Sequence, residues 1–272
     1  MRAVSFTKSV LAVKDEARAG RAAGQRHPVY ALDSKLLAHR FAQILGLRVP
    51  KIYGSKVPLS AIDFRPGTVI KPVNAYCARG VFIAHHDGRI RYLNNNLIFS
   101  DPAEARAHAK DLIARELVRA DSWLSEELIG GTEYNVRDIK FYMFYGEVGL
   151  VLETQRMPEC KRCWYDPAGQ IVKTGKYEDV PFVGGGGFAE VMELAKTISV
   201  EIPAPFARID LLVSGPEIVF GEITPAPSSL DRFNTEWDSR LGYLFVKAAS
   251  RLASDAGYGK SFAAFRKAMK SK

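Results

Sequence analysis

Residues 207–224 place the strongest constraint on the fold, because two apolar segments are separated there by a short turn sequence. The segments are A-R-I-D-L-L-V at 207–213 and E-I-V-F-G-E-I-T at 217–224, with Ser-Gly-Pro between them. Apolar runs on both sides of such a turn predict an antiparallel β-hairpin. Asp210 and Glu222 would then lie side by side on adjacent strands and point to the same face.

This predicted pair of carboxylates is unfavourable unless a cation or bound protons compensate its charge. Hard divalent cations such as Mg²⁺ prefer oxygen ligands of this kind, so Asp210 and Glu222 are candidate metal ligands. The polar face of an ordinary antiparallel sheet is the alternative.

A second segment, S-E-E-L-I-G-G-T-E-Y-N-V at 125–136, has the layout of a nucleotide hinge. Extended backbone through Leu128 and Ile129 could present N–H and C=O groups to an adenine edge. Glu126 could accept from the exocyclic amine and Glu133 from the ribose hydroxyls. Taken alone, the segment is explained at least as well by a surface strand with two solvated glutamates.

Upstream, the sequence F-R-P-G-T-V-I-K-P-V at 64–73 predicts a strand that ends on Lys71. Pro72 stops the strand, and a loop follows. A lysine at this position can reach into a cleft.

Taken together, these segments resemble the ATP-grasp superfamily from about Asp33 to Gly242. The D-S-K at 33–35, followed by L-L-A-H-R-F-A-Q-I-L-G-L-R-V-P, is similar to the family's opening lysine, helix and G-L-x-V-P turn. The resemblance implies an α+β fold in which two subdomains clamp ATP between antiparallel sheets. By this resemblance Lys35 and Lys71 bind the phosphates of ATP, Glu126 and Glu133 contact adenine and ribose, and Asp210 and Glu222 bind Mg²⁺. The further candidate nucleotide contacts are Arg79, Glu127, Leu128 and Ile129, and Thr224 is a further candidate metal ligand.

Within the superfamily, the sequence most resembles the TupA-like branch, whose members are associated with bacterial cell-surface polymers. The residues behind this resemblance are D-I-K-F-Y-M-F-Y-G-E-V at 138–148, F-G-E-I-T-P-A-P-S-S-L at 220–230 and E-W-D-S-R-L-G at 236–242. It implies that Lys140 lies near the phosphates. Arg208 matches an arginine that D-Ala:D-Ala-ligase-like members place on the transferring phosphate.

The sequence departs from the family pattern at two places. The loop after Lys71 reads N-A-Y-C-A-R-G-V, where the family has a glycine- and serine-rich loop whose amides close over the phosphates. Arg79 could supply charge in place of those amides. Thr224 stands where many ligases have an asparagine as a second metal ligand, so the number of metal ions stays open.

The implied activity is ATP- and Mg²⁺-dependent ligation of a carboxylate to an amine through an acyl phosphate, in the synthesis of a cell-surface polymer or peptide. The candidate catalytic residues are Arg208, Lys140 and Ser228, with Ser228 orienting the acyl phosphate or the acceptor. Ser228 could equally belong to a polar loop without such a role. Phosphate transfer to a hydroxyl acceptor, and nucleotide binding with weak or no turnover, are the alternative functions.

The landmarks divide the chain into a lead segment over residues 1–60, a small ATP-binding subdomain over 61–128 and a large subdomain with the metal hairpin over 129–272. Further predicted elements are helices near 34–45, 103–119 and 188–198, and strands near 67–71, 81–84, 90–93, 134–143 and 147–154. The glycines at 184–187 do not follow a strand in a phosphate-loop frame. We therefore interpret them as a flexible connection.

The short lead segment has no room for the α/β domain that precedes the first ATP lysine in many ligases, so we expect acceptor recognition elsewhere. One candidate is an insertion over residues 155–183, which contains Arg156, Lys161, Arg162, Trp164 and Tyr165. Others are the 225–232 loop, a second subunit of a homo-oligomer or a partner protein. The acceptor would be a small molecule or a polyanionic or carrier-bound group.

Composition agrees with an enzyme of this kind. The 272 residues are 47% hydrophobic and contain no apolar run long enough to span a bilayer, so we expect a cytoplasmic protein. The net charge is +8, but the chain lacks an aromatic-and-basic motif for nucleic acid. Phe262, Phe265 and Met269 recur at helical spacing in a basic tail, which predicts a terminal helix docked on the large subdomain. Peripheral contact with anionic lipid or a polyanionic acceptor is the alternative role of this tail.

Overall fold

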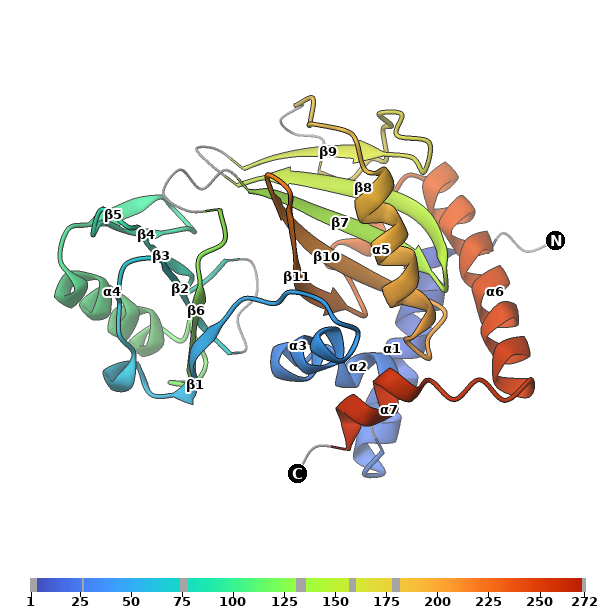
Figure 1. The fold of residues 1–272 in the computed structure, drawn as a ribbon, viewed down its shortest axis with the longest axis horizontal. Helices are drawn as coiled ribbons and strands as arrows, with labels where there is room; N and C mark the ends of the chain where they lie inside the picture. The colour runs from blue at the N-terminus through green and yellow to red at the C-terminus, as the bar shows by residue number, and fades with distance from the viewer. Residues whose placement is uncertain are drawn as a thin grey trace. The chain divides into compact units, whose positions relative to one another are not determined.

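The chain forms two compact units, each built on an antiparallel sheet, and its fold is of the mixed α+β class (Figure 1). One unit combines Met1–Val49 with Arg137–Lys272, and the other is Pro50–Val136. The first 49 residues thus group with the C-terminal half of the chain, whereas the sequence suggested divisions at residues 60 and 128. This computed structural model describes residues 4–25, 27–73, 78–130, 136–156, 160–177 and 182–270.

The Pro50–Val136 unit contains a six-stranded sheet in the order β1-β6-β2-β3-β4-β5. Helix α4 packs against β4 and β5, over a core that includes Ile70, Phe82 and Trp123. The bounds are β1 Ile52–Val57, β2 Thr68–Pro72, β3 Phe82–Ala84, β4 Ile90–Tyr92, β5 Leu97–Phe99, β6 Trp123–Glu127, α4 Pro102–Ala114 and the 3-10 helix η1 Leu59–Ala61.

Helix α4 begins as its sequence predicts. The Asp101 side chain accepts a hydrogen bond of 2.7 Å from the Ala103 amide, and Pro102 occupies the first helical position. The helix is shorter than the predicted 103–119, because Glu116 has a φ of 55°, in the left-handed region that ends a helix.

The other unit contains a five-stranded sheet in the order β11-β10-β7-β8-β9. Its strands are β7 Arg137–Phe144, β8 Glu147–Gln155, β9 Lys161–Tyr165, β10 Ala207–Ser214 and β11 Glu217–Thr224. Strands β10 and β11 form the hairpin that the alternating sequence predicted. Strand β9 lies inside the expected insertion, and its Trp164 and Tyr165 are buried, so these two aromatic side chains are core residues instead of acceptor contacts.

The helices of this unit come before, between and after its strands in the sequence. They are α1 Phe6–Ala22, α2 Pro28–Ala31, α3 Lys35–Ile44, α5 Ala189–Val200, α6 Thr235–Gly257, α7 Ala263–Met269 and the 3-10 helix η2 Leu230–Arg232. Helices α3 and α5 agree with the predicted spans. Helix α1 was not predicted; its Phe6 ring lies 4.8 Å from the Phe206 ring and 5.6 Å from the Phe144 ring, which fixes α1 to the sheet.

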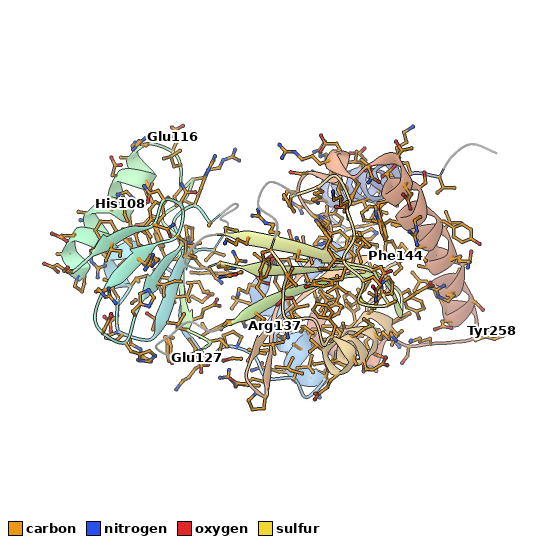
Figure 2. The ribbon with its side chains drawn as sticks, turned by 90° about the horizontal axis from the view of Figure 1, so that it is seen from above. His108, Glu116, Glu127, Arg137, Phe144 and Tyr258 are labelled. Carbon is orange, nitrogen blue, oxygen red and sulfur yellow. The ribbon has the colours of Figure 1, made fainter. Side chains whose placement is uncertain are left out.

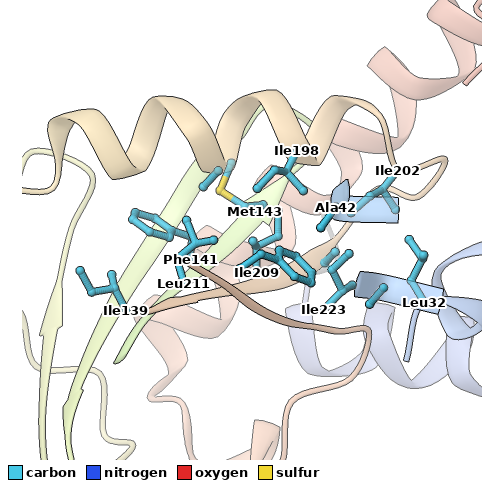
Figure 3. Packing of buried hydrophobic residues seen from close by; sticks show 14 of the residues in the cluster. Leu32, Ala42, Ile139, Phe141, Met143, Ile198, Ile202, Ile209, Leu211 and Ile223 are labelled. Atoms are coloured by element: carbon cyan, nitrogen blue, oxygen red, sulfur yellow. The ribbon is translucent and has the colours of Figure 1, made fainter. Parts of the chain in front are cut away.

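Different helices cover the two faces of this sheet, because alternate residues of a strand point to opposite faces. Ile139, Phe141 and Met143 of β7 pack beneath α5 (Figure 3). Tyr142 and Phe144 pack with residues of α1 and α6 on the other face. Figure 2 labels the two ends of β7, Arg137 and Phe144.

The polar residues of β7 share the face of α1 and α6. Asp138 and Lys140 alternate with Ile139 and Phe141, and they precede the apolar Tyr142 along the strand. The same face of the sheet is therefore apolar at one end of β7 and charged at the other.

The basic tail forms the docked helix that its spacing predicted. Phe265 and Ala268 of α7 are buried in the same core as residues of α3, and α7 contacts α3 directly. Within the described ranges, none of the helices combines the length and the apolar character needed to cross a membrane.

Candidate functional site

The predicted metal ligands lie opposite each other on the β10–β11 hairpin. Asp210 is paired with Glu222, and the next pair is Leu211 with Phe220. Gly221 is thus the extra residue of a β-bulge, and a Cβ on it would lie 3.0 Å from the Asp210 carbonyl oxygen. Glycine therefore permits the bulge that brings Glu222 opposite Asp210.

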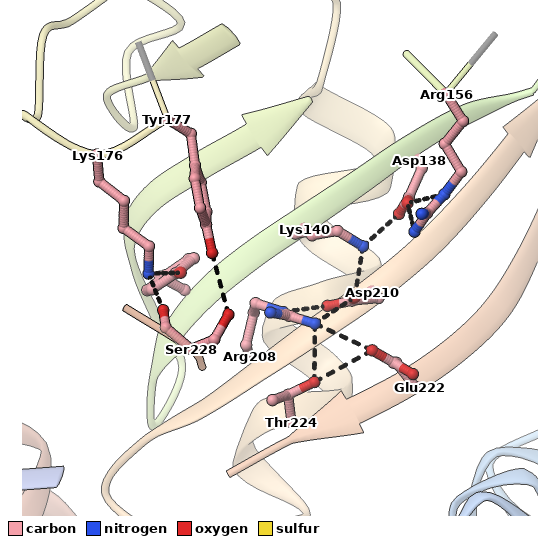
Figure 4. A network of polar contacts seen from close by, with 11 residues as sticks. Asp138, Lys140, Arg156, Lys176, Tyr177, Arg208, Asp210, Glu222, Thr224 and Ser228 are labelled. Atoms are coloured by element: carbon pink, nitrogen blue, oxygen red, sulfur yellow. Dashed lines mark hydrogen bonds and ion pairs between the residues drawn. The ribbon is translucent and has the colours of Figure 1, made fainter. Parts of the chain in front are cut away.

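Arg208 connects both carboxylates. Its Nε and Nη2 atoms donate to the two oxygens of Asp210 at 2.6 and 2.7 Å. The same Nη2 donates to Glu222 Oε1 at 3.0 Å and to Thr224 Oγ1 at 2.8 Å (Figure 4). One guanidinium thus compensates two negative charges with strong, charge-assisted hydrogen bonds.

Lys140 extends the network to a third carboxylate, which the sequence analysis had not singled out. Its Nζ donates to Asp210 Oδ2 and to Asp138 Oδ1, both at 2.6 Å. Arg156 donates to Asp138 Oδ2 from Nε at 2.9 Å and from Nη2 at 2.5 Å. Burial opposes ionisation of Asp138, but Lys140 and Arg156 hold the pKa of its carboxyl below the ordinary value. Arg156, considered from the sequence as an acceptor contact, therefore belongs to the charged network.

The side chains of this network fit a hard cation and phosphate groups. Asp210 and Glu222 offer carboxylate oxygens and Thr224 a hydroxyl, which are ligand types that Mg²⁺ takes. Across the part of the chain that the structure describes, no three His, Cys, Asp or Glu side chains gather as a metal-binding group. This donor set agrees with sites where one or two carboxylates and the substrate phosphates hold Mg²⁺ together.

Lys35, the predicted phosphate lysine, is the first residue of α3, which packs on β11. Asp33 precedes it by two residues. Burial and the charge of Glu222 raise the pKa of Asp33, while Arg208 and Arg21 act in the opposite direction. The start of α3 is therefore close enough to the hairpin for these charges to act on it.

Two predicted nucleotide contacts meet in the Pro50–Val136 unit. Lys71 on β2 and Glu126 on β6 form an ion pair between Nζ and Oε1. Glu126 is buried and Lys71 is half-buried. The two side chains predicted to contact phosphate and adenine thus lie together on neighbouring strands.

Glu127 and Leu128, which follow Glu126, make hydrogen bonds to other residues of the Pro50–Val136 unit. Glu127 Oε2 accepts from the Lys51 amide at 3.0 Å, and the Leu128 amide donates to the Gly67 carbonyl at 2.9 Å. The Leu128 amide, one of the backbone groups predicted to face adenine, therefore already has a hydrogen-bond partner in this unit.

The other predicted residues of this unit lie in loops. Arg79 is exposed in the turn at 78–80, and Gly80 has a φ of 73°, which favours glycine. Glu133, the predicted ribose contact, lies outside the described residues.

Ser228, the third catalytic candidate, is exposed in the loop that follows β11. Its carbonyl oxygen accepts from Lys176 Nζ at 2.6 Å, and its hydroxyl lies 3.0 Å from the Tyr177 hydroxyl (Figure 4). Neither Lys176 nor Tyr177 could be predicted from the sequence, because T-G-K-Y at 174–177 matches no motif.

Residues 17–246 match the family described as TupA-like ATPgrasp. The chain belongs to this family. The hairpin with Asp210 and Glu222, and the strand with Lys140, lie inside the matched range of this ATP-grasp protein. No curated protein matches its sequence.

Solved structures similar to this ATP-grasp chain include ligases. For D-alanine-D-alanine ligase from Bacillus anthracis complexed with ATP, the TM-score is 0.50 at 14% identity, over 89% of this chain and 76% of the ligase. For the ATP-grasp ligase PsnB complexed with a phosphomimetic variant of its minimal precursor, Mg and ADP, the values are 0.45 and 13%, over 84% and 64%. For the L-amino acid ligase from Bacillus licheniformis they are 0.43 and 13%, over 79% and 46%. The chain thus spans less than two thirds of the last two proteins, and the first similarity shows the ATP-grasp fold.

Proposed function

We propose that the chain is an ATP- and Mg²⁺-dependent ligase that joins a carboxylate to an amine through an acyl phosphate, in the synthesis of a cell-surface polymer or peptide. The observation that carries this proposal is the network of Lys140, Arg208, Asp210 and Glu222 on three adjacent strands. Membership in the TupA-like ATP-grasp family supports ATP as the phosphoryl donor.

The reaction has two steps. A carboxylate oxygen of the substrate attacks the γ-phosphorus of ATP, the bond from that phosphorus to the β–γ bridging oxygen breaks, and ADP leaves. The amine nitrogen then attacks the acyl carbon, the bond from that carbon to the phosphate oxygen breaks, and the nitrogen loses one proton. The products are an amide, inorganic phosphate and ADP. Such chemistry depends on positioning and charge stabilisation, so it requires no protein nucleophile.

Lys140 and Arg208 would stabilise the charge on the transferring phosphoryl group. Their side chains are only 11% and 14% exposed, and charges shielded from water act more strongly than exposed ones. Mg²⁺ at Asp210, Glu222 and Thr224 would supply further positive charge to the phosphate oxygens. Arg208 and Lys140 could then turn from the carboxylates towards the phosphate.

The nucleotide contacts follow the same proposal. Lys35 would bind phosphate from the start of α3. In the Pro50–Val136 unit, Lys71 and Arg79 would contact phosphate and Glu126 the adenine amine. Leu128 and Ile129 would offer backbone groups and Glu133 would bind the ribose, while Glu127 would support the strand end through the Lys51 amide.

Substrate recognition is proposed to involve Arg162 and Ser228. The Arg162 guanidinium lies 4.6 Å from the centre of the Tyr177 ring, and Tyr177 contacts Ser228. A guanidinium matches the geometry of a carboxylate, so Arg162 would suit the carboxylate substrate or an anionic, carrier-bound acceptor.

The test is to supply the purified chain with ATP, Mg²⁺ and a panel of amino acids and small carboxylates and to identify the products. ADP together with an amide supports the ligase. ADP together with a phosphorylated hydroxyl compound would replace it with a phosphotransferase. ATP binding without any turnover across the panel would replace it with a nucleotide-binding protein.

A further inference from the structure

Lys176 is a lysine without exposed surface. Its Nζ donates to the Ser228 carbonyl at 2.6 Å and to the Tyr142 hydroxyl at 3.3 Å, and it lies 4.7 Å from the centre of the Phe233 ring. Among the described residues, no carboxylate lies within ion-pair distance of this ammonium. Burial of an ammonium among aromatic rings is costly, so a neutral side chain would fill this position at a lower cost in folding free energy.

The next residue, Tyr177, contacts the other end of Ser228. Its hydroxyl lies 3.0 Å from Ser228 Oγ, so consecutive residues hold the carbonyl and the hydroxyl of one serine. Trp164 fixes this pair to the sheet, because its Nε1 donates to the Lys176 carbonyl at 2.6 Å. The Trp164 and Tyr177 rings are nearly parallel, with an interplanar angle of 4°.

The backbone at Ser228 needs such support. Ser229, the next residue, has a φ of 53° and a ψ of 44°, a left-handed conformation that costs free energy for a residue with a side chain. This loop starts directly after Thr224, whose hydroxyl accepts a hydrogen bond from Arg208. The position of Ser228 relative to Arg208 is thus determined by a short, strained segment.

We propose that Lys176 and Tyr177 form a clamp that sets the position of the Ser228 hydroxyl, and that this hydroxyl orients the carboxylate substrate and its acyl phosphate for attack by the amine. Lys176 and Tyr177 are positioning residues, since Lys176 is enclosed and acts through Ser228. The catalytic part of this inference rests on the proposed ligase function, whereas the clamp itself can be tested without turnover.

The groups around Lys176 also change the pKa of its amine. Burial and, to a smaller extent, the charge of Arg208 lower the pKa of Lys176 to about 7, although Asp231 acts in the opposite direction. Tyr142 and Tyr177 are the other titratable groups that face the amine. A charged donor binds a carbonyl more strongly than a neutral one, so the hold on Ser228 should weaken as the pH rises above neutrality.

The structural test is amide hydrogen exchange of the full chain, comparing wild type with Lys176→Met and Tyr177→Phe. Exchange in the 225–232 loop should rise about tenfold or more in Lys176→Met, while exchange in α5 stays unchanged. Lys173→Met is the matched control, because Lys173 is exposed on the same segment. If exchange in the 225–232 loop is unchanged in both Lys176→Met and Tyr177→Phe, the proposed clamp is wrong, whether or not the chain turns over ATP. Tyr177→Phe gives this answer even if Lys176→Met does not fold.

The catalytic test is the ratio of ADP formed to amide formed. Tyr177→Phe should raise this ratio and the apparent KM for the carboxylate about tenfold, with the KM for ATP unchanged, because a badly oriented acyl phosphate is lost to water. The same substitution should have no further effect in a Ser228→Ala background. Equal effects in both backgrounds overturn the role of Ser228. A wild type that makes neither ADP nor amide would instead remove the ligase function and leave the exchange result standing.

Discussion

Asp210 and Glu222 accept hydrogen bonds from the same atom, Nη2 of Arg208, although they belong to different strands. Two carboxylates directly opposite each other on paired strands repel, and the shared guanidinium offsets this repulsion. A metal ion at these oxygens has to compete with Arg208. We therefore expect weak Mg²⁺ binding by the free protein and much stronger binding together with the nucleotide, whose phosphates would attract Arg208.

Glu222→Gln should abolish Mg²⁺-dependent ATP turnover, with a loss of at least about a hundredfold in kcat, because it removes charge from a proposed metal ligand and keeps its shape. The fold should persist, since the Glu222 side chain is half exposed. Steady-state kinetics and circular dichroism check both points. Glu217→Gln on the same strand is the control, because Glu217 pairs only with the surface residue Arg48 in the contacts described. Full turnover by Glu222→Gln at saturating ATP would remove Glu222 from the metal site.

Lys140→Met should lower the free energy of unfolding by about 1.5–3 kcal/mol, because Asp138 and Asp210 would lose the ammonium they share and keep only their arginine partners. Denaturant unfolding measures this change. Lys196→Met, which breaks an exposed pair with Glu193, should cost less than about 1 kcal/mol. Equal costs for the two variants would mean that the Lys140 ion pairs contribute no more than surface pairs do.

Local sequence patterns predicted the parts of the site that lie on regular strands. The apolar segments around Asp210 and Glu222 predicted both strands and their hairpin. The pairing of Asp210 with Glu222 was expected too, but it depends on the bulge at Gly221, because the register set by the turn alone would place Gly221 opposite Asp210. Lys71 was placed at the end of a strand in the same way. The contact of Lys71 with Glu126 was not predicted, since it depends on which strands of the sheet become neighbours.

The supporting contacts of the site could not be read from sequence. Lys176 lies 52 positions from Ser228, and its burial results from three aromatic rings brought together by folding.

The glycines at 184–187, interpreted from the sequence as a flexible connection, make hydrogen bonds to residues of the sheet. The Gly185 amide donates to Glu153 Oε1 at 3.2 Å, and Arg137 donates to the Gly186 carbonyl at 2.6 Å. Composition alone does not distinguish a fitted glycine segment from a flexible one.

Gly184→Ala should therefore destabilise the fold by about 1–3 kcal/mol, because the new Cβ would lie 2.1 Å from Oε2 of the buried Glu153. Thermal or denaturant unfolding measures the loss. Gly257→Ala is the control: Gly257 ends α6, and a Cβ added there would have no neighbouring atom within 4 Å, so alanine should stabilise the chain by up to about 1 kcal/mol. A neutral Gly184→Ala would show that the segment adjusts as a flexible connection does.

Lys176→Met should change how stability depends on pH. In the folded chain the pKa of Lys176 is lowered to about 7 by burial, against an ordinary value of 10.5. Below pH 7 the amine is charged in both states and the cost of burial is fully present. Between pH 7 and 10.5 the unfolded chain binds more protons, so wild-type stability should rise with pH, by at most about 1.4 kcal/mol per pH unit. The methionine variant should lack this rise, and its advantage over wild type should shrink across that window. Urea unfolding at pH 6 to 10 tests this, and parallel curves for the two proteins would contradict it.

The preference for ATP over GTP tests the nucleotide hinge proposed around Glu126. If Glu126 accepts from the adenine amine, a guanine base would place its carbonyl oxygen against that carboxylate, and acceptor would face acceptor. An unsatisfied contact of this kind costs about 1–3 kcal/mol, so ATP should bind on the order of ten- to a hundredfold more tightly than GTP. Glu126→Gln should reduce this preference, because an amide can also donate.

Glu127→Gln is the matched control for this measurement. Neighbouring residues of a strand point to opposite faces, and the Glu127 carboxylate already accepts from the Lys51 amide. Its substitution should therefore leave the ATP-to-GTP ratio unchanged. Equilibrium binding of both nucleotides to wild type and the two variants decides between the alternatives. If wild type does not discriminate, or if only Glu127→Gln alters the ratio, the adenine contact assigned to Glu126 is wrong.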